Sequence, residues 1–143
     1  MKPYRKFNKW FQIRWREPIG NPNCPYLYRW TFIFFGFSIR LHHWIKSDDR
    51  RFFHDHSCDL ISVVLKGKYK NVTPEGAREV QAPSIWRAKA KAKHYLDIPA
   101  EGAWTLLLFG RPYHKWGFYV NDHKWRPLRY FHKFGIIQNE SYQ

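Results

Sequence analysis

Two histidines one residue apart, His54 and His56, stand directly before an apolar run that ends in Lys-Gly-Lys. On an extended chain such residues point to the same face, about 6.5 to 7 Å apart along the backbone, so both imidazoles can reach one metal ion. Neutral imidazole is a common metal ligand, and a nitrogen-ligated site without a cysteine cluster suits Zn, Fe, Mn, Co or Ni. The spacing favours a divalent metal site, although a solvated or hydrogen-bonded histidine pair has the same pattern.

A third histidine, His94, follows an alternation of alanine and lysine over residues 88–93. Alanine and lysine are good helix formers, but a helix would scatter the lysines around its axis. Strand periodicity instead places Ala88, Ala90 and Ala92 on the face of His94, with the lysines opposite. We therefore expect a strand whose small inner residues leave free volume beside the imidazole, unless a turn within the stretch breaks the register.

Short apolar or alternating runs separated by turn residues follow one another from residue 26 onward, which is typical of an all-β sandwich or barrel. The clearest predicted strands are enriched in aromatic and β-branched residues, and they span 28–35, 37–44, 58–65, 68–73, 94–98, 104–110 and 115–120. Residues 1–25 are rich in Lys, Arg, Trp and Pro and end in a turn-forming stretch. We therefore expect an N-terminal basic, aromatic arm over 1–25 and one β-barrel domain over 26–143.

Two segments together resemble the motifs of the cupin superfamily. The first, FHDHSCDLISVVLKGKY, has an H-x-H pair followed by an apolar strand and a turn that contains glycine. The second, PSIWRAKAKAKHYLDI, begins with proline and leads to a histidine. The fuller string, from LHHWIKSDDRRFFHDH through VVLKGKY to WTLLLFG and KWGFYV, resembles small phage-encoded and bacterial cupin-like proteins over about residues 26–131. The resemblance implies a double-stranded β-helix, or jelly-roll, barrel.

The same resemblance places His54, His56 and His94 in the metal-binding positions. One member departs from the family pattern, because the usual glutamate falls near Leu60 or Ile61, neither of which binds metal. We therefore expect three histidine ligands, with the remaining positions open to water or substrate. A 2-oxoglutarate oxygenase would show a carboxylate where His56 stands, which argues against that class. Whether the site catalyses a reaction is left open.

Arg40 and His42 share one face of the strand 37–44, and one of its two faces must point inward. If theirs does, both line the pocket, and Arg40 suits a carboxylate or phosphate. An outward orientation fits the sequence equally well. Asp48 and Asp49, shortly before the histidine pair, either accept an imidazole N–H or build a turn. His114, His123 and His132 lie among basic and aromatic residues and are expected at the surface.

The 143-residue chain carries a formal net charge of +14, which attracts anionic partners. Its two cysteines are too few for a disulfide framework and fit a reducing compartment, so we expect a cytoplasmic protein, in the host cell if it is phage-encoded. We see no signal peptide or membrane span. Cupin barrels often form homodimers, so the resemblance leads us to expect a homodimer of this chain.

Two functions are thus compatible with the sequence. In the first, a metal-binding cupin binds, and in an enzyme would transform, an anionic small molecule or nucleotide at the three histidines. In the second, a phage-type accessory protein captures nucleotides or nucleic acid through its basic surface, with Arg, Lys, Trp and Tyr at both ends of the chain stacking bases and neutralising phosphates. In that case the metal is structural or absent.

Overall fold

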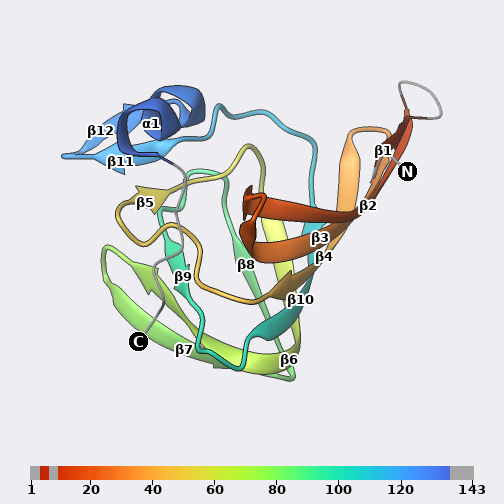
Figure 1. Ribbon diagram of the computed structural model, residues 1–143, viewed down its shortest axis with the longest axis horizontal. Coiled ribbons are helices and arrows are strands. Elements are labelled where there is room, and N and C mark those ends of the chain that lie inside the picture. Colours follow the sequence, from red (N-terminus) through yellow and green to blue (C-terminus); the bar gives the residue numbers. More distant parts are fainter. Residues whose placement is uncertain (1–3, 7–9, 136–143) are drawn as a thin grey trace.

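The computed structural model describes residues 4–6 and 10–135, with side chains from residue 10 onward. Antiparallel strands dominate this part of the chain, and one short helix follows them (Figure 1). The strands are β1 (Tyr4–Lys6), β2 (Phe11–Asn21), β3 (Cys24–Phe34), β4 (Phe37–Trp44), β5 (Phe53–His54), β6 (Leu60–Thr73), β7 (Gly76–Gln81), β8 (Ser84–Ala88), β9 (Tyr95–Asp97), β10 (Ala103–Phe109), β11 (Phe118–Val120) and β12 (His123–Trp125), and the helix is α1 (Pro127–Phe134).

The larger sheet among the described strands has the order β1-β2-β3-β4-β10-β6-β7, and β8 and β9 also pair with β6. The long strand β6 joins both parts of this sheet, since residues 60–64 pair with β8 and residues 68–73 pair with β7. A smaller sheet has the order β12-β11-β5. The result is a jelly-roll β-barrel, which confirms the predicted all-β class.

The first part of the chain contributes a strand to the barrel. Within residues 1–25, expected to lie on the domain as an arm, β2 forms an antiparallel ladder with β3 that runs from Phe11 opposite Phe34 to Asn21 opposite Cys24. The predicted turn lies between these strands, at residues 22–23. Side chains of β2 thereby become part of the sheet that positions the site.

The alanine and lysine alternation does not form one continuous strand, so that expectation is wrong. Strand β8 ends at Ala88, a turn follows in which the Ala92 N–H donates to the Lys89 carbonyl, and β9 starts only at Tyr95. A residue outside the turn stabilises it, because Asp59 Oδ1 accepts the N–H of Ala90 at 2.9 Å. An alternating pattern cannot report a contact between residues so far apart in the chain.

Two predicted strands, 58–65 and 68–73, merge into β6 across Gly67. Gly67 has φ of +85°, a conformation open to glycine but costly for other residues, and a Cβ there would lie 2.6 Å from the Gly102 carbonyl oxygen. The neighbouring ladder with β10 shifts register between Trp104 and Thr105. Gly67 thus lets the strand bend and continue instead of ending in a turn.

The two faces of the central strands differ in chemistry. Leu27, Trp44, Val64 and Ala103 point inward and form part of the main core. On the outer face, aligned residues of β3, β4, β10 and β6 are apolar yet 37–40% exposed: Phe32, Ile39, Leu108 and Ile61. Successive residues of these strands therefore point to opposite faces, as predicted, and both faces carry apolar side chains.

The helix α1 was not predicted and packs with β11 and β12 beside the barrel (Figure 1). Pro127 starts it, which suits the fixed φ of proline at a helix N-terminus. Tyr130 is fully buried against Phe118 and donates its hydroxyl to Asp49 at 2.8 Å. This second core fastens the C-terminal hairpin and helix to the segment that leads into the histidine pair.

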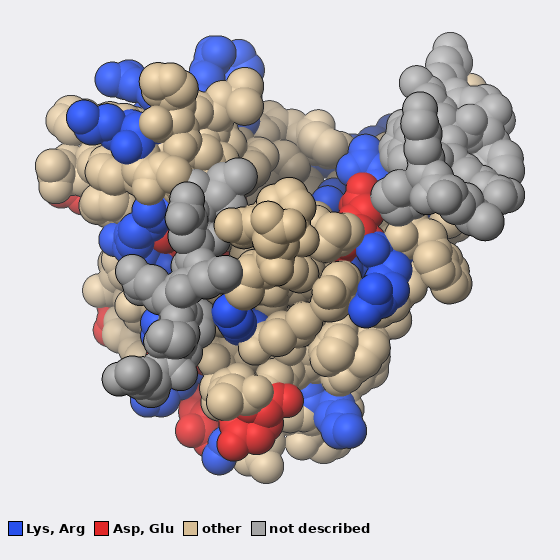
Figure 2. Space-filling model, viewed as in Figure 1, with Lys and Arg blue, Asp and Glu red and all other residues tan. Residues whose placement is uncertain are grey.

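Lys and Arg side chains are spread over the face drawn in Figure 2, with a group over β12 and α1 and a smaller acidic group below β6 and β7.

Within residues 4–6 and 10–135, no helix is long and apolar enough to cross a membrane.

Candidate metal centre

The three predicted histidines lie together. His54 is in β5, His56 follows two residues later, and His94 directly precedes β9. His54 and His94 face each other in an antiparallel bridge and exchange two backbone hydrogen bonds of 3.0 Å. One ring nitrogen from each of the three imidazoles lies within 4.8 Å of the other two. The two sequence motifs therefore converge on one point, and metal ligation by these residues stays a prediction.

Burial sets the charge of the cluster. It lowers the pKa of His54 well below the usual 6.5, that of His56 to about 4 and that of His94 to about 3. The neighbouring imidazoles lower the pKa values of His54 and His94 further, because a second positive charge nearby would be repelled. All three rings are neutral at pH 7, which is the state that donates a lone pair to a metal ion.

Neighbouring side chains orient the rings. Nδ1 of His94 lies 2.9 Å from Oδ1 of Asn71 on β6. Because an amide oxygen only accepts, Nδ1 carries the proton and Nε2 of His94 keeps its lone pair. Nδ1 of His56 is buried and has no hydrogen-bond partner among the described residues. The cluster thus holds nitrogen atoms whose hydrogen-bonding capacity the described protein leaves unused.

The two aspartates before the pair have separate roles. Asp48 accepts the N–H of Leu96 through Oδ1, and its Oδ2 lies 3.8 Å from Nε2 of His54. Asp49 is turned away and accepts hydrogen bonds from Arg51 and Tyr130. Asp48 is therefore the acidic neighbour of the cluster, whereas Asp49 anchors the segment.

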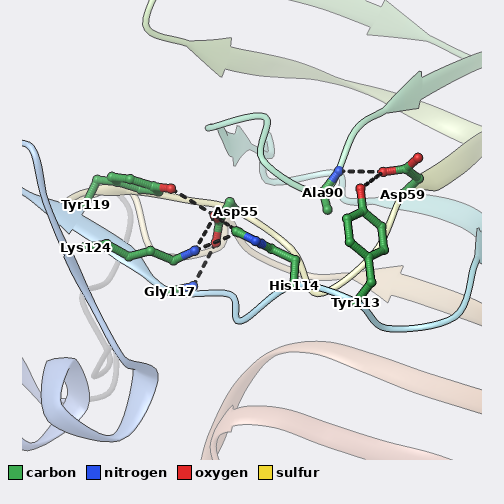
Figure 3. A network of polar contacts seen from close by, with 8 residues as sticks. All are labelled: Asp55, Asp59, Ala90, Tyr113, His114, Gly117, Tyr119 and Lys124. Atoms are coloured by element: carbon green, nitrogen blue, oxygen red, sulfur yellow. Dashed lines mark hydrogen bonds and ion pairs between the residues drawn. The ribbon is translucent and has the colours of Figure 1, made fainter.

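No carboxylate replaces the missing glutamate among the described residues of the cluster. Leu60 is buried in the core and Ile61 faces outward. Asp59 accepts hydrogen bonds from the Ala90 N–H and the Tyr113 hydroxyl (Figure 3). The three-histidine composition inferred from the sequence therefore matches what the fold brings together.

Asp55, between the two histidines, is the centre of a polar network (Figure 3). Its carboxylate is fully buried and accepts hydrogen bonds from the Gly117 N–H at 2.8 Å, the Tyr119 hydroxyl at 2.9 Å and Lys124 Nζ at 2.8 Å, and His114 Nε2 lies 2.7 Å away. These donors hold the pKa of Asp55 below its usual range although burial acts in the opposite direction. The network ties the H-x-H segment to the C-terminal hairpin.

Sequence reasoning missed this network and expected His114 at the surface. The His114 side chain is 18% exposed because it packs onto the Asp55 carboxylate. The partners are separated from Asp55 by 59 to 69 positions, so no spacing rule connects them. The one signal in the sequence was an aspartate between two histidines expected to face the barrel, because a buried carboxylate needs hydrogen-bonding or cationic partners.

A cavity of about 520 Å³ opens beside the cluster and is lined by His54 and His56. Arg40 and His42 also line it, so the polar face of β4 points inward and the alternative left open by the sequence is settled in favour of this orientation. Their neighbours Ser38 and Trp44 are buried on the same face, whereas Phe37 and Ile39 are exposed on the opposite face. Ligand binding by Arg40 and His42 stays a prediction.

No family model matches the chain, and no curated protein matches it by sequence. Solved structures do match. HppE in its Fe(II) form is 9% identical, with 66% of this chain and 56% of that chain covered and a TM-score of 0.55. A putative ethanolamine utilization protein Q from Salmonella typhimurium is 12% identical, with 66% and 76% covered and a TM-score of 0.52. A cupin-2 domain protein from Shewanella frigidimarina is 14% identical, with 53% and 72% covered and a TM-score of 0.46.

The chain has the cupin fold. The first motif supplies His54 and His56, the second supplies His94, and the barrel brings the three together beside a cavity that His54 and His56 line. At such low identity the likeness concerns the fold, and this chain spans only about half of HppE.

Proposed function

We propose that this protein is a metal-dependent cupin that binds an anionic small molecule at its three-histidine site. The observation that carries the proposal is the convergence of three neutral imidazoles, two of which, His54 and His56, line a cavity together with Arg40 and His42. A divalent cation and a basic cavity wall together form a site for a negatively charged ligand.

The residues fit a divalent metal ion. With bonds of about 2.1 Å, two imidazole nitrogens on a tetrahedral ion are about 3.4 Å apart, so nitrogens within 4.8 Å need only small ring rotations to converge. Three neutral nitrogen donors suit Fe, Zn, Mn, Ni or Co. HppE, which shares the fold, has a solved Fe(II) form, so the fold accommodates such an ion.

The side chains around the centre have distinct tasks in this proposal. Asn71 fixes the tautomer and ring plane of His94, and the Asp55 network holds the strand that carries His54 and His56. A divalent metal bound by three histidines would act as a Lewis acid on water or a ligand oxygen at its open positions. Arg40 would neutralise the ligand and orient it toward the cluster.

Metal analysis of protein purified without a histidine tag tests the proposal. We expect stoichiometric bound metal in the wild type after incubation with Fe(II) or Zn(II) and dialysis, and loss of that metal in His54→Ala and His94→Ala. His123→Ala is the matched control, because His123 is exposed on β12 and should leave the metal content unchanged.

Two results would contradict the proposal. One is wild-type protein that stays metal-free, and the other is metal retained equally in folded His54→Ala and His94→Ala variants. Oligonucleotide binding by metal-free protein, with a steep salt dependence, would instead favour the accessory nucleic-acid-binding function.

A further inference from the structure

The inner faces of β3 and β4 carry cationic side chains next to the histidine cluster. Arg29 on β3 lies opposite His42 on β4, and Thr31 lies opposite Arg40, which places all four side chains on the inward face. Arg29, Arg40 and His42 line the same cavity as His54 and His56. The cavity thus has a metal-ligating wall and a basic wall.

Several polar atoms on the basic wall are buried without a partner among the described residues. Both ring nitrogens of His42 are unpaired although the residue is only 7% exposed. Nε of Arg29 and Oγ1 of Thr31 are buried and unpaired as well. A buried imidazole or guanidinium N–H without an acceptor is costly, and such groups are normally satisfied by water, protein or a ligand. Arg29 and His42, which carry the three unpaired nitrogen atoms, belong to the lining of the cavity.

The positive charge of this wall is only partly compensated by protein. Glu17 pairs with Arg29 at 3.2 Å. Arg40 is bonded through Nε to the neutral hydroxyl of Ser38 at 3.3 Å and has no carboxylate partner among the described residues. Burial, followed by the nearby Arg29, lowers the pKa of Arg40 to about 10. Arg40 is therefore still charged at pH 7, and a bound anion would stabilise this buried charge.

The acidic residues that also line the cavity do not supply this anion. Asp49 is occupied by Arg51, and Asp55 is occupied by Lys124. Asp48 accepts the N–H of Leu96 through Oδ1, and its Oδ2 faces His54. The negative charge that matches Arg40 therefore has to come from outside the described chain.

The basic wall lies within reach of the cluster. The guanidinium of Arg40 stacks on the Phe109 ring, with 4.3 Å to its centroid, and the Phe109 ring lies 6.4 Å from that of His56. A single small ligand in this cavity can therefore contact Arg40 with one end and the histidine cluster with the other.

We infer that Arg29, Arg40 and His42 form a subsite for a phosphate-type group, a phosphate monoester or a phosphonate, on the ligand whose other end reaches the three histidines. The inference rests on the proposed function and names its substrate class. Two guanidiniums and an imidazole N–H offer more donors than a single carboxylate can accept, whereas a tetrahedral dianion has three oxygens for them. The charge of Arg40, which no carboxylate among the described residues balances, adds to the attraction for such an anion.

Calorimetric titration with inorganic phosphate and with acetate tests the subsite. We expect phosphate to bind wild-type protein about tenfold or more tightly than acetate. Arg40→Gln should weaken phosphate binding about 10- to 100-fold, the effect of losing a charge-assisted hydrogen-bonding group. Arg87→Gln is the matched control, since Arg87 is exposed on β8 and should leave the affinity unchanged. His42→Phe, which keeps an aromatic ring and removes both nitrogens, gives a second variant if Arg40→Gln does not fold.

The metal variants separate this inference from the proposed function. Metal-free His94→Ala should still bind phosphate, because the subsite needs no metal. Phosphate binding in a protein that never takes up metal would support the subsite and overturn the proposed metal function. Equal affinity for phosphate and acetate, wild-type phosphate affinity in folded Arg40→Gln and His42→Phe, or loss of phosphate binding in folded His94→Ala would each overturn the subsite.

Discussion

Asn71 and His94 form a side-chain pair that bridges β6 and the segment before β9: Oδ1 of Asn71 lies 2.9 Å from Nδ1 of His94. The amide oxygen thereby fixes the protonated nitrogen of the ring and leaves Nε2 for a metal ion. Outer partners of this kind commonly change metal affinity by about 10- to 100-fold.

Replacing Asn71 should therefore weaken metal binding without removing a ligand. We expect Asn71→Leu to lower the affinity for Zn²⁺ about 10- to 100-fold, because the His94 ring loses the acceptor that orients it. Asn71→Asp keeps an acceptor at the same place and should bind Zn²⁺ at least as tightly as wild type. Competition titration against a chelator measures both, and wild-type affinity in Asn71→Leu would refute a role for this pair.

The metal-free protein should lose stability in mild acid. The pKa of His56 is about 4 and that of His94 about 3 in the folded chain, whereas an unfolded histidine titrates near 6.5. Below pH 6.5 the unfolded chain binds more protons, so the free energy of unfolding falls by about 1.4 kcal/mol per pH unit for each such histidine. His54 and His42 act in the same direction, and Asp48, whose pKa is raised, acts oppositely.

Urea denaturation of metal-free protein between pH 7.5 and 4.5 measures this dependence. Stability should be flat above pH 7 and fall below 6.5, since the histidines with lowered pKa outnumber the one opposing aspartate. His56→Gln should show a shallower fall than wild type. A stability that is constant from pH 7.5 to 4.5 would show that the histidines are not buried in the neutral form.

Removing the buried Asp55 carboxylate should be strongly destabilising. Asp55→Ala leaves Lys124 and the Gly117 N–H without their acceptor, and breaking a buried charge pair typically costs about 3 to 5 kcal/mol. Lys89→Ala is the contrast, because the Lys89 side chain is 85% exposed and its ion pair with Asp59 should contribute at most about 1 kcal/mol. Thermal and urea unfolding compare the two variants, and equal stabilities would argue against the Asp55 network.

Two glycines test the bend in β6. Gly67 and Gly76 both have positive φ, but a Cβ at Gly67 would lie 2.6 Å from the Gly102 carbonyl oxygen, whereas nothing lies within 4 Å of one at Gly76. Gly67→Ala should therefore lower the unfolding temperature clearly more than Gly76→Ala. Gly76→Ala adds no steric clash and is destabilised only by the unfavourable backbone conformation, by about 1 to 2 kcal/mol. The reverse order would contradict the close approach of the two strands.

The features predicted correctly from the sequence depend on local patterns. The inward and outward faces of β4 follow from alternation, and the sequence left open only which face is the inner one. The meeting of His54, His56 and His94 could be predicted because the motif resemblance specifies a fold that brings the three residues together. The spacing of His54 and His56 already placed these two side chains on one face.

The features that were missed depend on contacts between distant residues. The turn after Ala88 is held by Asp59, and the position of His114 is set by Asp55. Helix α1 is only eight residues long, and its burial depends on Tyr130 reaching Asp49. Such short elements are stabilised by tertiary packing more than by their own propensity, so periodicity gives little warning of them.

X-ray absorption at the metal edge of the loaded, tag-free protein tests the central claim most directly, because it counts the imidazoles bound to one ion. We predict three histidine nitrogens at about 2.0 to 2.1 Å for Zn²⁺, with oxygen completing the shell, and one imidazole fewer in His94→Ala. A shell with no more than one imidazole, or one that is identical in wild type and His94→Ala, would contradict the convergence of the three histidines on a metal.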